Sequence, residues 1–291
     1  MLSICIPIYN VQVKSLVEAL LSQAGALGVP YEIIVMDDRS TQYKEENSKL
    51  PDVTYIALDE NIGRAKIRNR LVKAARYDYI LFLDCDSEVV LPSFLKNYVA
   101  EINNKEKVVC GGRIYSNEPP AKDKLLHWKY GKNKESQPVN VRMANPYQSF
   151  MTNNFLIEKK VLEALPFDER LSGYGHEDTL MGYNLKKQGV PIKHIDNPIL
   201  HAELQSNAEF LQKTECAAAN LKSILEYVNY DKAFIEDVML LRYYMGLKRW
   251  GLFFLFKLFF VPTRPIIKGI LSNGNANLTL FNFYKLGCLN G

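Results

Sequence analysis

The chain has 291 residues, of which 47% are hydrophobic and 23% charged, proportions that are ordinary for a globular protein. This length is enough for one large α/β domain and a smaller C-terminal extension. A net charge of +4 is too small to predict binding to nucleic acid. Five cysteines without a CxxC pair predict free thiols in a reducing compartment. No signal peptide precedes the first predicted strand, so we expect a cytoplasmic protein.

Short apolar runs alternate with helical patterns through the first 90 residues. A strand is predicted to start at Leu2, and apolar residues then recur at helical spacing between residues 13 and 21. Further strands are predicted at residues 32–36, 53–57 and 79–83. This βαβ series predicts an α/β fold with a mostly parallel, Rossmann-like sheet and helices on both faces.

Asp84 and Asp86 follow directly after the apolar strand predicted at residues 79–83. Because they lie two positions apart, both carboxylates point to the same side of an extended backbone. A shared cation would relieve their repulsion, and hard oxygen ligands suit Mg²⁺ or Mn²⁺. Ligands of open α/β sheets collect at the carboxyl ends of the strands, where this pair lies. The alternative is a solvated loop with two surface aspartates.

Five short motifs occur along the chain in an order that is typical of one family. They are IPIYN, DDRS, NIGRAKIRN, DCD and GYGHED, which start at residues 6, 37, 61, 84 and 173. Together they resemble family 2 glycosyltransferases with the GT-A fold, over about residues 1–205. Arg39 is a departure, because the family usually has glycine there.

The resemblance implies a metal-dependent, inverting glycosyltransferase with Mn²⁺ or Mg²⁺ as its cofactor. The enzyme would be of the hexosyl- or N-acetylhexosaminyltransferase type. It would move a sugar from a nucleotide-sugar, with UDP-sugar as the first choice, to a hydroxyl of a glycan or lipid-linked saccharide. Such an activity would belong to polysaccharide or glycolipid biosynthesis.

The first two motifs supply candidates for the nucleotide pocket. Pro7 and Tyr9 are expected just after the first strand, where an aromatic ring could pack on a base or ribose. Alternatively, Pro7 only ends the strand and Tyr9 only packs. The resemblance implies that Asp38 contacts the base, with Asp37 structural. The alternative for both aspartates is an N-cap before a helix predicted at residues 41–50.

Arg64, Lys66 and Arg68 begin a helix that is predicted after Gly63. A helix N-terminus with cations beside it suits the negative charge of a nucleotide. The resemblance places this segment beside the base, and Arg64 is therefore a donor-site candidate. Alternatively, the three basic residues form a solvated helix face.

The resemblance also assigns the metal site and the base. Asp86 would ligate the cation, and Asp84 would contact the ribose, or the metal through water. His201, at the end of a predicted strand, is a candidate extra ligand, or else a packed or surface histidine. Asp178 would be the general base, and Glu177 would orient the acceptor or hold the loop. Their alternative role is to complement the dipole of the helix predicted up to residue 187.

Residues 1–205 are predicted to form the catalytic domain, with a nucleotide-sugar-binding half at 1–118 and an acceptor-binding half at 119–205. Residues 206–291 are predicted to form a helical extension, with helices at 207–228 and 232–247. Its eleven-residue apolar run would be about 16 Å long as a helix, too short for a bilayer core of about 30 Å.

The basic residues around this run predict a helix at residues 248–268 that lies in the interface of an anionic membrane. We therefore expect a peripheral protein at the inner face of the cell membrane, beside lipid-linked acceptors. A core helix or a dimer interface is the alternative, which leaves the oligomeric state open.

Two other functions stay open. A nucleotidyltransferase also uses acidic pairs and a parallel sheet, but no glycine-rich, basic phosphate loop follows the first strand. A non-catalytic, membrane-surface subunit that binds nucleotide or glycan is the other alternative. The intact Asp84, Asp86 and Asp178 argue against it, because decay would show there first.

Overall fold

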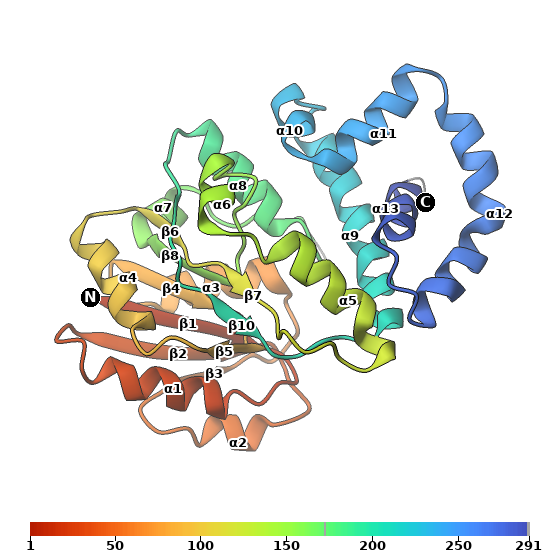
Figure 1. Cartoon of the computed structure of the whole chain (residues 1–291). Coiled ribbons are helices and arrows are strands. Elements are labelled where there is room, and N and C mark those ends of the chain that lie inside the picture. Colours follow the sequence, from red (N-terminus) through yellow and green to blue (C-terminus); the bar gives the residue numbers. More distant parts are fainter. Residues whose placement is uncertain (172, 290–291) are drawn as a thin grey trace. The chain divides into compact units, whose positions relative to one another are not determined.

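Seven strands form the main sheet of the computed structural model, which describes residues 1–171 and 173–289 (Figure 1). Their order across the sheet is β3-β2-β1-β4-β8-β6-β9. Among these described strands, β8 alone runs antiparallel to its neighbours β4 and β6. The predicted α/β fold with a mostly parallel sheet is therefore confirmed. The strands are β1 (Leu2–Ile8), β2 (Tyr31–Asp37), β3 (Thr54–Ala57), β4 (Tyr79–Leu83), β6 (Val108–Cys110), β8 (Asn154–Glu158) and β9 (Lys193–His194).

Alternate residues of the central strands enter two separate cores, one on each face of the sheet. On β4, Ile80 and Phe82 pack into one core, and Leu81 and Leu83 into the other. This alternation follows from the two-residue period of a strand, and it explains why β4 is apolar throughout. Helices α3, α7 and α8 contribute to the first core, and α1 and α4 to the second. These helices are α1 (Lys14–Ala24), α3 (Arg64–Ala74), α4 (Phe94–Asn103), α7 (Lys159–Ala164) and α8 (Glu177–Lys187).

A second, smaller sheet joins three segments that are far apart in the sequence. It has the order β5-β10-β7, with β5 (Ser87–Val89), β7 (Arg113–Ile114) and β10 (Ile199–His201). β10 is antiparallel to β5 and parallel to β7. The register pairs His201 with Ser87 and Ile199 with Arg113. This sheet therefore fixes residues from three regions of the chain beside the carboxyl end of β4.

The chain divides into two compact units. The first contains Met1–Ser116, Ser136–Arg170 and Glu177–Glu203, and the second contains Asn117–Glu135, Leu171–His176 and Leu204–Gly291. The last change of unit lies close to the expected boundary after residue 205. Two segments that were expected in the catalytic domain nevertheless belong to the second unit. The reason is packing: Leu126 of α5 (Leu125–Tyr130) shares a core with Phe210, Phe281 and Tyr284.

Helices form the second unit. Helix α9 begins with a capping box, in which Ser206 and Glu209 bond each other's backbone and side chains. Glu215 of α9 contacts Lys268 Nζ at 2.9 Å and Arg264 Nη2 at 3.3 Å, and it accepts a hydrogen bond from Tyr284. One carboxylate thus connects three helices. The helices after the capping box are α9 (Asn207–Tyr227), α10 (Lys232–Asp237), α11 (Met239–Arg249), α12 (Phe253–Ser272) and α13 (Leu278–Cys288).

Two helices predicted from the sequence, one in each unit, need correction. The helix predicted at 232–247 is broken at Val238, whose backbone is extended, so that α10 and α11 are separate. The helix predicted at 41–50 is a short α2 (Lys44–Ser48), and its N-cap is Tyr43. In the part of the chain that the structure describes, no single helix meets the length and hydropathy that a membrane span needs. The bent pair α11 and α12, at 117°, meets them only when taken together.

Candidate active site

The order of the sheet places a topological switch point between β1 and β4. The chain builds β2 and β3 on one side of β1, and then β4 on the other side. Ligands of such sheets bind outside the carboxyl ends of the strands at this point. Tyr9 directly follows β1 here, with 51% of its surface exposed, and Asp84 directly follows β4.

Pro7 lies inside β1, opposite Met36 of β2, and not after the strand as expected. The alternative that Pro7 ends the strand is also wrong. β4 pairs with β1 only over residues 2–5, so Pro7 lies beyond the last partner on that side. A central strand can therefore hold a proline here, because the ladder to β4 no longer needs its missing N–H. The predicted contact of Pro7 and Tyr9 with a nucleotide stays a prediction.

Two arginines balance the charge of Asp84. Arg68 Nη2 lies 3.0 Å from Asp84 Oδ1, and Arg113 Nη2 lies 3.6 Å from Asp84 Oδ2. Arg68 is only 1% exposed, and its guanidinium lies over the ring of Phe167. Asp84 therefore has two guanidinium groups beside it. The expectation that Asp84 and Asp86 share a cation stays a prediction.

Asp86 faces His201 across the small sheet. Asp86 Oδ1 lies 3.5 Å from His201 Nδ1, and Ala202 N donates a hydrogen bond of 2.9 Å to Asp86 O. Burial would raise the pKa of Asp86, but His201, Arg113 and Arg64 lower it below its ordinary value. The carboxylate is therefore ionised throughout the physiological pH range. The imidazole packs against the ring of Tyr115.

Asp86 and His201 fit two ligands of a divalent cation. Asp86 Oδ1 is buried and accepts no well-formed hydrogen bond from the described part of the chain. A cation stabilises a buried carboxylate oxygen that lacks a hydrogen bond. An imidazole nitrogen is an acceptable ligand of Mn²⁺ beside oxygen ligands. Among residues 1–171 and 173–289, no His, Cys, Asp and Glu side chains form a group of three that could hold a metal. The remaining ligands would therefore come from substrate oxygens and water, as is common for Mg²⁺.

Glu177 and Asp178 begin α8 in opposite electrostatic environments. Glu177 Oε1 lies 3.5 Å from both Arg64 Nη1 and Arg68 Nη1. Burial opposes ionisation of Glu177, but these two cations lower its pKa below the ordinary value. Burial and the charge of Glu177 raise the pKa of Asp178 to about 6. Neighbouring carboxyl groups with separated pKa values are typical of acid–base sites. These contacts join Glu177 to α3, and its two expected roles, orienting the acceptor or holding the loop, stay predictions.

The loop before α8 has its own structural reason for glycine. Gly175 has φ +99°, and a Cβ there would lie 2.6 Å from Ala217 Cβ on α9. Asn220 of α9 also donates to the backbone carbonyls of Tyr174 and Gly175. Packing of this loop against α9 therefore explains the glycine.

Asp37 and Asp38 both bind backbone near the ends of β2 and β3. Asp38 accepts hydrogen bonds from Ile62 N at 2.7 Å and Gly63 N at 3.0 Å. Asp37 accepts from Ser40 N at 2.6 Å and from Tyr55 Oη at 2.5 Å. Neither caps α2, so that alternative is wrong. Asp38 orders the loop before α3, and its predicted contact with a base would use its remaining lone pairs.

The sequence pointed to Arg64 and gave no role to Arg68 or Arg113. Arg64 and Arg68 are four residues apart, so they share one face of α3, and this spacing was a usable signal. Arg68 is the buried one, whereas 43% of the Arg64 side chain is exposed. Arg113 carried no local signal, because the pairing of β7 with β10 brings it to Asp84.

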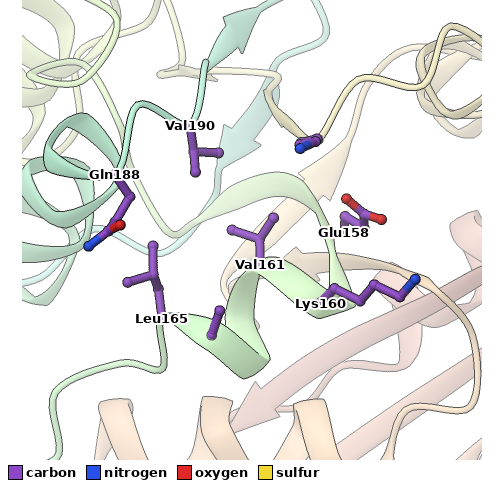
Figure 2. A pocket seen from close by; sticks show the side chains of 8 residues that line it. Glu158, Lys160, Val161, Leu165, Gln188 and Val190 are labelled. Atoms are coloured by element: carbon purple, nitrogen blue, oxygen red, sulfur yellow. The ribbon is translucent and has the colours of Figure 1, made fainter.

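A pocket near the amino end of β4 is separate from the residues around Asp84 and Asp86 (Figure 2). It is lined by the side chains of Glu158, Lys160, Val161 and Leu165, with Val190 opposite (Figure 2). Glu158 ends β8 and pairs with Tyr79 at the start of β4. The pocket therefore lies at the amino end of β4, away from Asp84.

Comparisons with known proteins identify the class of this fold and site. Residues 3–165 match the family model "Glycosyl transferase family 2". More than half of the chain is covered, and the chain therefore belongs to glycosyl transferase family 2. This is the family that the sequence motifs predicted.

One curated relative and two solved structures illustrate the range of this similarity. Hyaluronan synthase of Pasteurella multocida is 28% identical over 205 residues, which cover 57% of this chain and 21% of the synthase. The chain thus spans about a fifth of the length of that relative. A mannosyltransferase from Pyrobaculum calidifontis, solved with GDP-Man and Mn²⁺, aligns with a TM-score of 0.56 and 16% identity. That alignment covers 84% of this chain and 70% of the other.

Glucosyl-3-phosphoglycerate synthase from Mycobacterium tuberculosis was solved with Mn²⁺, UDP and glucosyl-3-phosphoglycerate. It aligns with a TM-score of 0.53 and 17% identity, over 78% of this chain and 79% of the other. At such low identity, the two solved structures show a shared fold. The GT-A fold that the motifs predicted is thereby confirmed.

Proposed function

We propose that the chain is a metal-dependent, inverting glycosyltransferase that moves a sugar from a UDP-sugar to a hydroxyl of a glycan or lipid-linked saccharide. One observation carries this proposal: His201, from the distant strand β10, faces Asp86 at the carboxyl end of β4. The names of the relatives support the substrate classes, since one makes hyaluronan and a structural neighbour binds UDP with Mn²⁺. Polysaccharide or glycolipid assembly is the corresponding biological role.

In this proposal, Asp86 and His201 hold Mn²⁺ or Mg²⁺. The cation would supply charge neutralisation on the leaving nucleoside diphosphate. Asp84, which Arg68 and Arg113 hold in place, accepts a hydrogen bond from a ribose hydroxyl of the donor. Arg64, half-exposed at the start of α3, adds positive charge beside the nucleotide.

Asp178 accepts the proton of the acceptor hydroxyl. A pKa of about 6 leaves most of the carboxylate ionised at neutral pH, yet makes it a stronger base than an ordinary aspartate. Glu177 raises that pKa through its charge and is itself held by Arg64 and Arg68. The hydroxyl attacks from the face opposite the nucleotide, so an α-linked donor gives a β-glycoside.

Calorimetry tests the donor site. UDP, GDP and CMP are titrated with and without Mn²⁺ into wild type, Asp86→Ala and the control Asp59→Ala, in which an exposed aspartate is removed. We expect UDP to bind only with Mn²⁺, and only to wild type and the control. The proposal is refuted if none of the three nucleotides binds to wild type in the presence of Mn²⁺.

A second variant tests the base. Asp178→Asn is expected to keep UDP binding and to lose transfer, because amide nitrogen cannot accept the proton. The matched control is Asp196→Asn, which changes an exposed aspartate of the same unit. Loss of binding and of transfer together in Asp178→Asn would remove the role of Asp178 as base.

A further inference from the structure

Helix α12 is apolar on the side that packs and also on the side that does not. Phe260, Ile267 and Leu271 are buried in the core of the second unit. The opposite side, which we call the outer face of α12, consists of seven exposed side chains. They are Phe254, Leu255, Leu258, Phe259, Val261, Ile266 and Ile270, and their exposed fractions run from 39% to 71%. A contiguous exposed apolar face is typical of an interaction surface, so the outer face needs a cover.

The apolar surface continues into the segment before α12. Trp250 is 76% exposed and Leu252 is 48% exposed, directly before the helix begins at Phe253. Exposed tryptophan beside an apolar helix face is typical of the headgroup layer of a membrane, where its ring is amphipathic. The exposed apolar side chains therefore all come from one segment of the chain, from Trp250 to Ile270.

Positive charge is concentrated in the same part of the chain. Residues 238–291 contain seven basic residues and no acidic one, although the whole chain has a net charge of only +4. Arg264 and Lys268 contact Glu215 of α9, so they are partly engaged inside the unit. Arg249, directly before Trp250, and Lys257, on α12 itself, are both exposed. This distribution attracts an anionic surface and repels a second copy of the same segment.

We propose that the outer face of α12 binds the surface of an anionic lipid bilayer, with the helix lying in the membrane plane. Its 20 residues make it about 30 Å long, and the exposed apolar side chains would enter the boundary of headgroups and acyl chains by about 5–10 Å. Arg249 and Lys257 would meet the anionic headgroups. This inference does not rest on the proposed transferase activity, because the second unit carries it alone.

Vesicle sedimentation of the full chain tests this docking surface. The vesicles are pure phosphatidylcholine, or phosphatidylcholine with about one third phosphatidylglycerol. Wild type is expected to sediment with the anionic vesicles and much less with the neutral ones. Leu255→Gln/Leu258→Gln should weaken binding by about tenfold or more, because two deeply inserting side chains become polar. The matched control Val90→Gln/Val141→Gln makes the same change at two exposed valines of the first unit and should bind as wild type.

A second pair of variants isolates the charge. Arg249→Gln/Lys257→Gln should lose most of the preference for anionic vesicles, whereas Lys73→Gln/Lys160→Gln, at exposed lysines of the first unit, should keep it. Wild type that stays in solution with both vesicle types would overturn the proposal. Equal sedimentation of Leu255→Gln/Leu258→Gln and wild type would do the same. A wild-type dimer in analytical ultracentrifugation that becomes monomeric in this variant would instead assign the outer face to a second copy.

Discussion

Replacing Arg68 by methionine is expected to destabilise the first unit more than any single change at an exposed arginine. The guanidinium is 1% exposed and lies between Asp84 Oδ1 at 3.0 Å and Glu177 Oε1 at 3.5 Å. Methionine has a similar length and can refill the space over Phe167, but it carries no charge. The variant therefore leaves two partly buried carboxylates without their common partner.

The size of this effect follows from the burial of the pair. Removing one partner of a buried ion pair costs about 3–5 kcal/mol. Arg113 still contacts Asp84, and Arg64 still contacts Glu177, so we expect the lower end, about 3 kcal/mol. With a urea m-value of about 3 kcal/mol/M, the midpoint falls by about 1 M.

Urea unfolding can assign this loss to the correct unit. The chain has two tryptophans, Trp128 and Trp250, and both belong to the second unit. Far-UV circular dichroism follows both units, whereas tryptophan fluorescence follows the second. The dichroism midpoint of Arg68→Met should fall, and the fluorescence midpoint should move little.

Arg64→Met is the matched control, because it removes the same charge from the same helix face. Its side chain is 43% exposed, and exposed ion pairs contribute about 1 kcal/mol or less. Equal midpoints for Arg64→Met and Arg68→Met would refute the reasoning from burial. Arg68→Lys should recover part of the stability but not all, because an ammonium cannot bridge both carboxylates as the planar fork does.

Three further predictions concern pH and the second unit. The rate of transfer should fall about tenfold per pH unit below about pH 6, because Asp178 becomes protonated. Glu177→Gln should shift this acidic limb of the pH–rate profile to lower pH, because it removes a charge that raises the pKa of Asp178. An unchanged acidic limb would contradict the assignment. Because the pKa of Asp178 is higher in the folded than in the unfolded state, its ionisation destabilises the folded state as the pH rises from about 4 to about 6. Asp178→Asn should therefore raise the melting temperature at pH 7 but not at pH 4. An equal increase at both pH values would refute the raised pKa. Glu215→Gln should lower the free energy of unfolding of the second unit by about 1–3 kcal/mol, because Lys268 and Arg264 lose their anionic partner, and the fluorescence midpoint should fall with it. The control Glu226→Gln, at an exposed glutamate, should leave the midpoint unchanged.

Local patterns in the sequence were sufficient for two elements next to candidate site residues. The predicted strand at 79–83 matches β4, and the helix predicted from Glu177 to residue 187 matches α8. Both depend on apolar periodicity and on residues near one another in the chain, which a sequence displays directly. The ordered motifs also identified the family, which the match over residues 3–165 confirms.

Only the tertiary structure decided what surrounds the two aspartates. Asp84 is held by Arg68 and Arg113. Asp86 faces His201, which comes 115 residues later in the chain. Arg113 and His201 are positioned by the strand pairings of β10 with β5 and β7, each of two or three residues, whereas Arg68 comes from α3. Such short strands leave almost no periodic signal, and their partners are selected by the burial and hydrogen bonding of the whole chain. The sequence by itself therefore determined the strands and the carboxylates, whereas long-range pairing and packing determined which side chain each carboxylate meets.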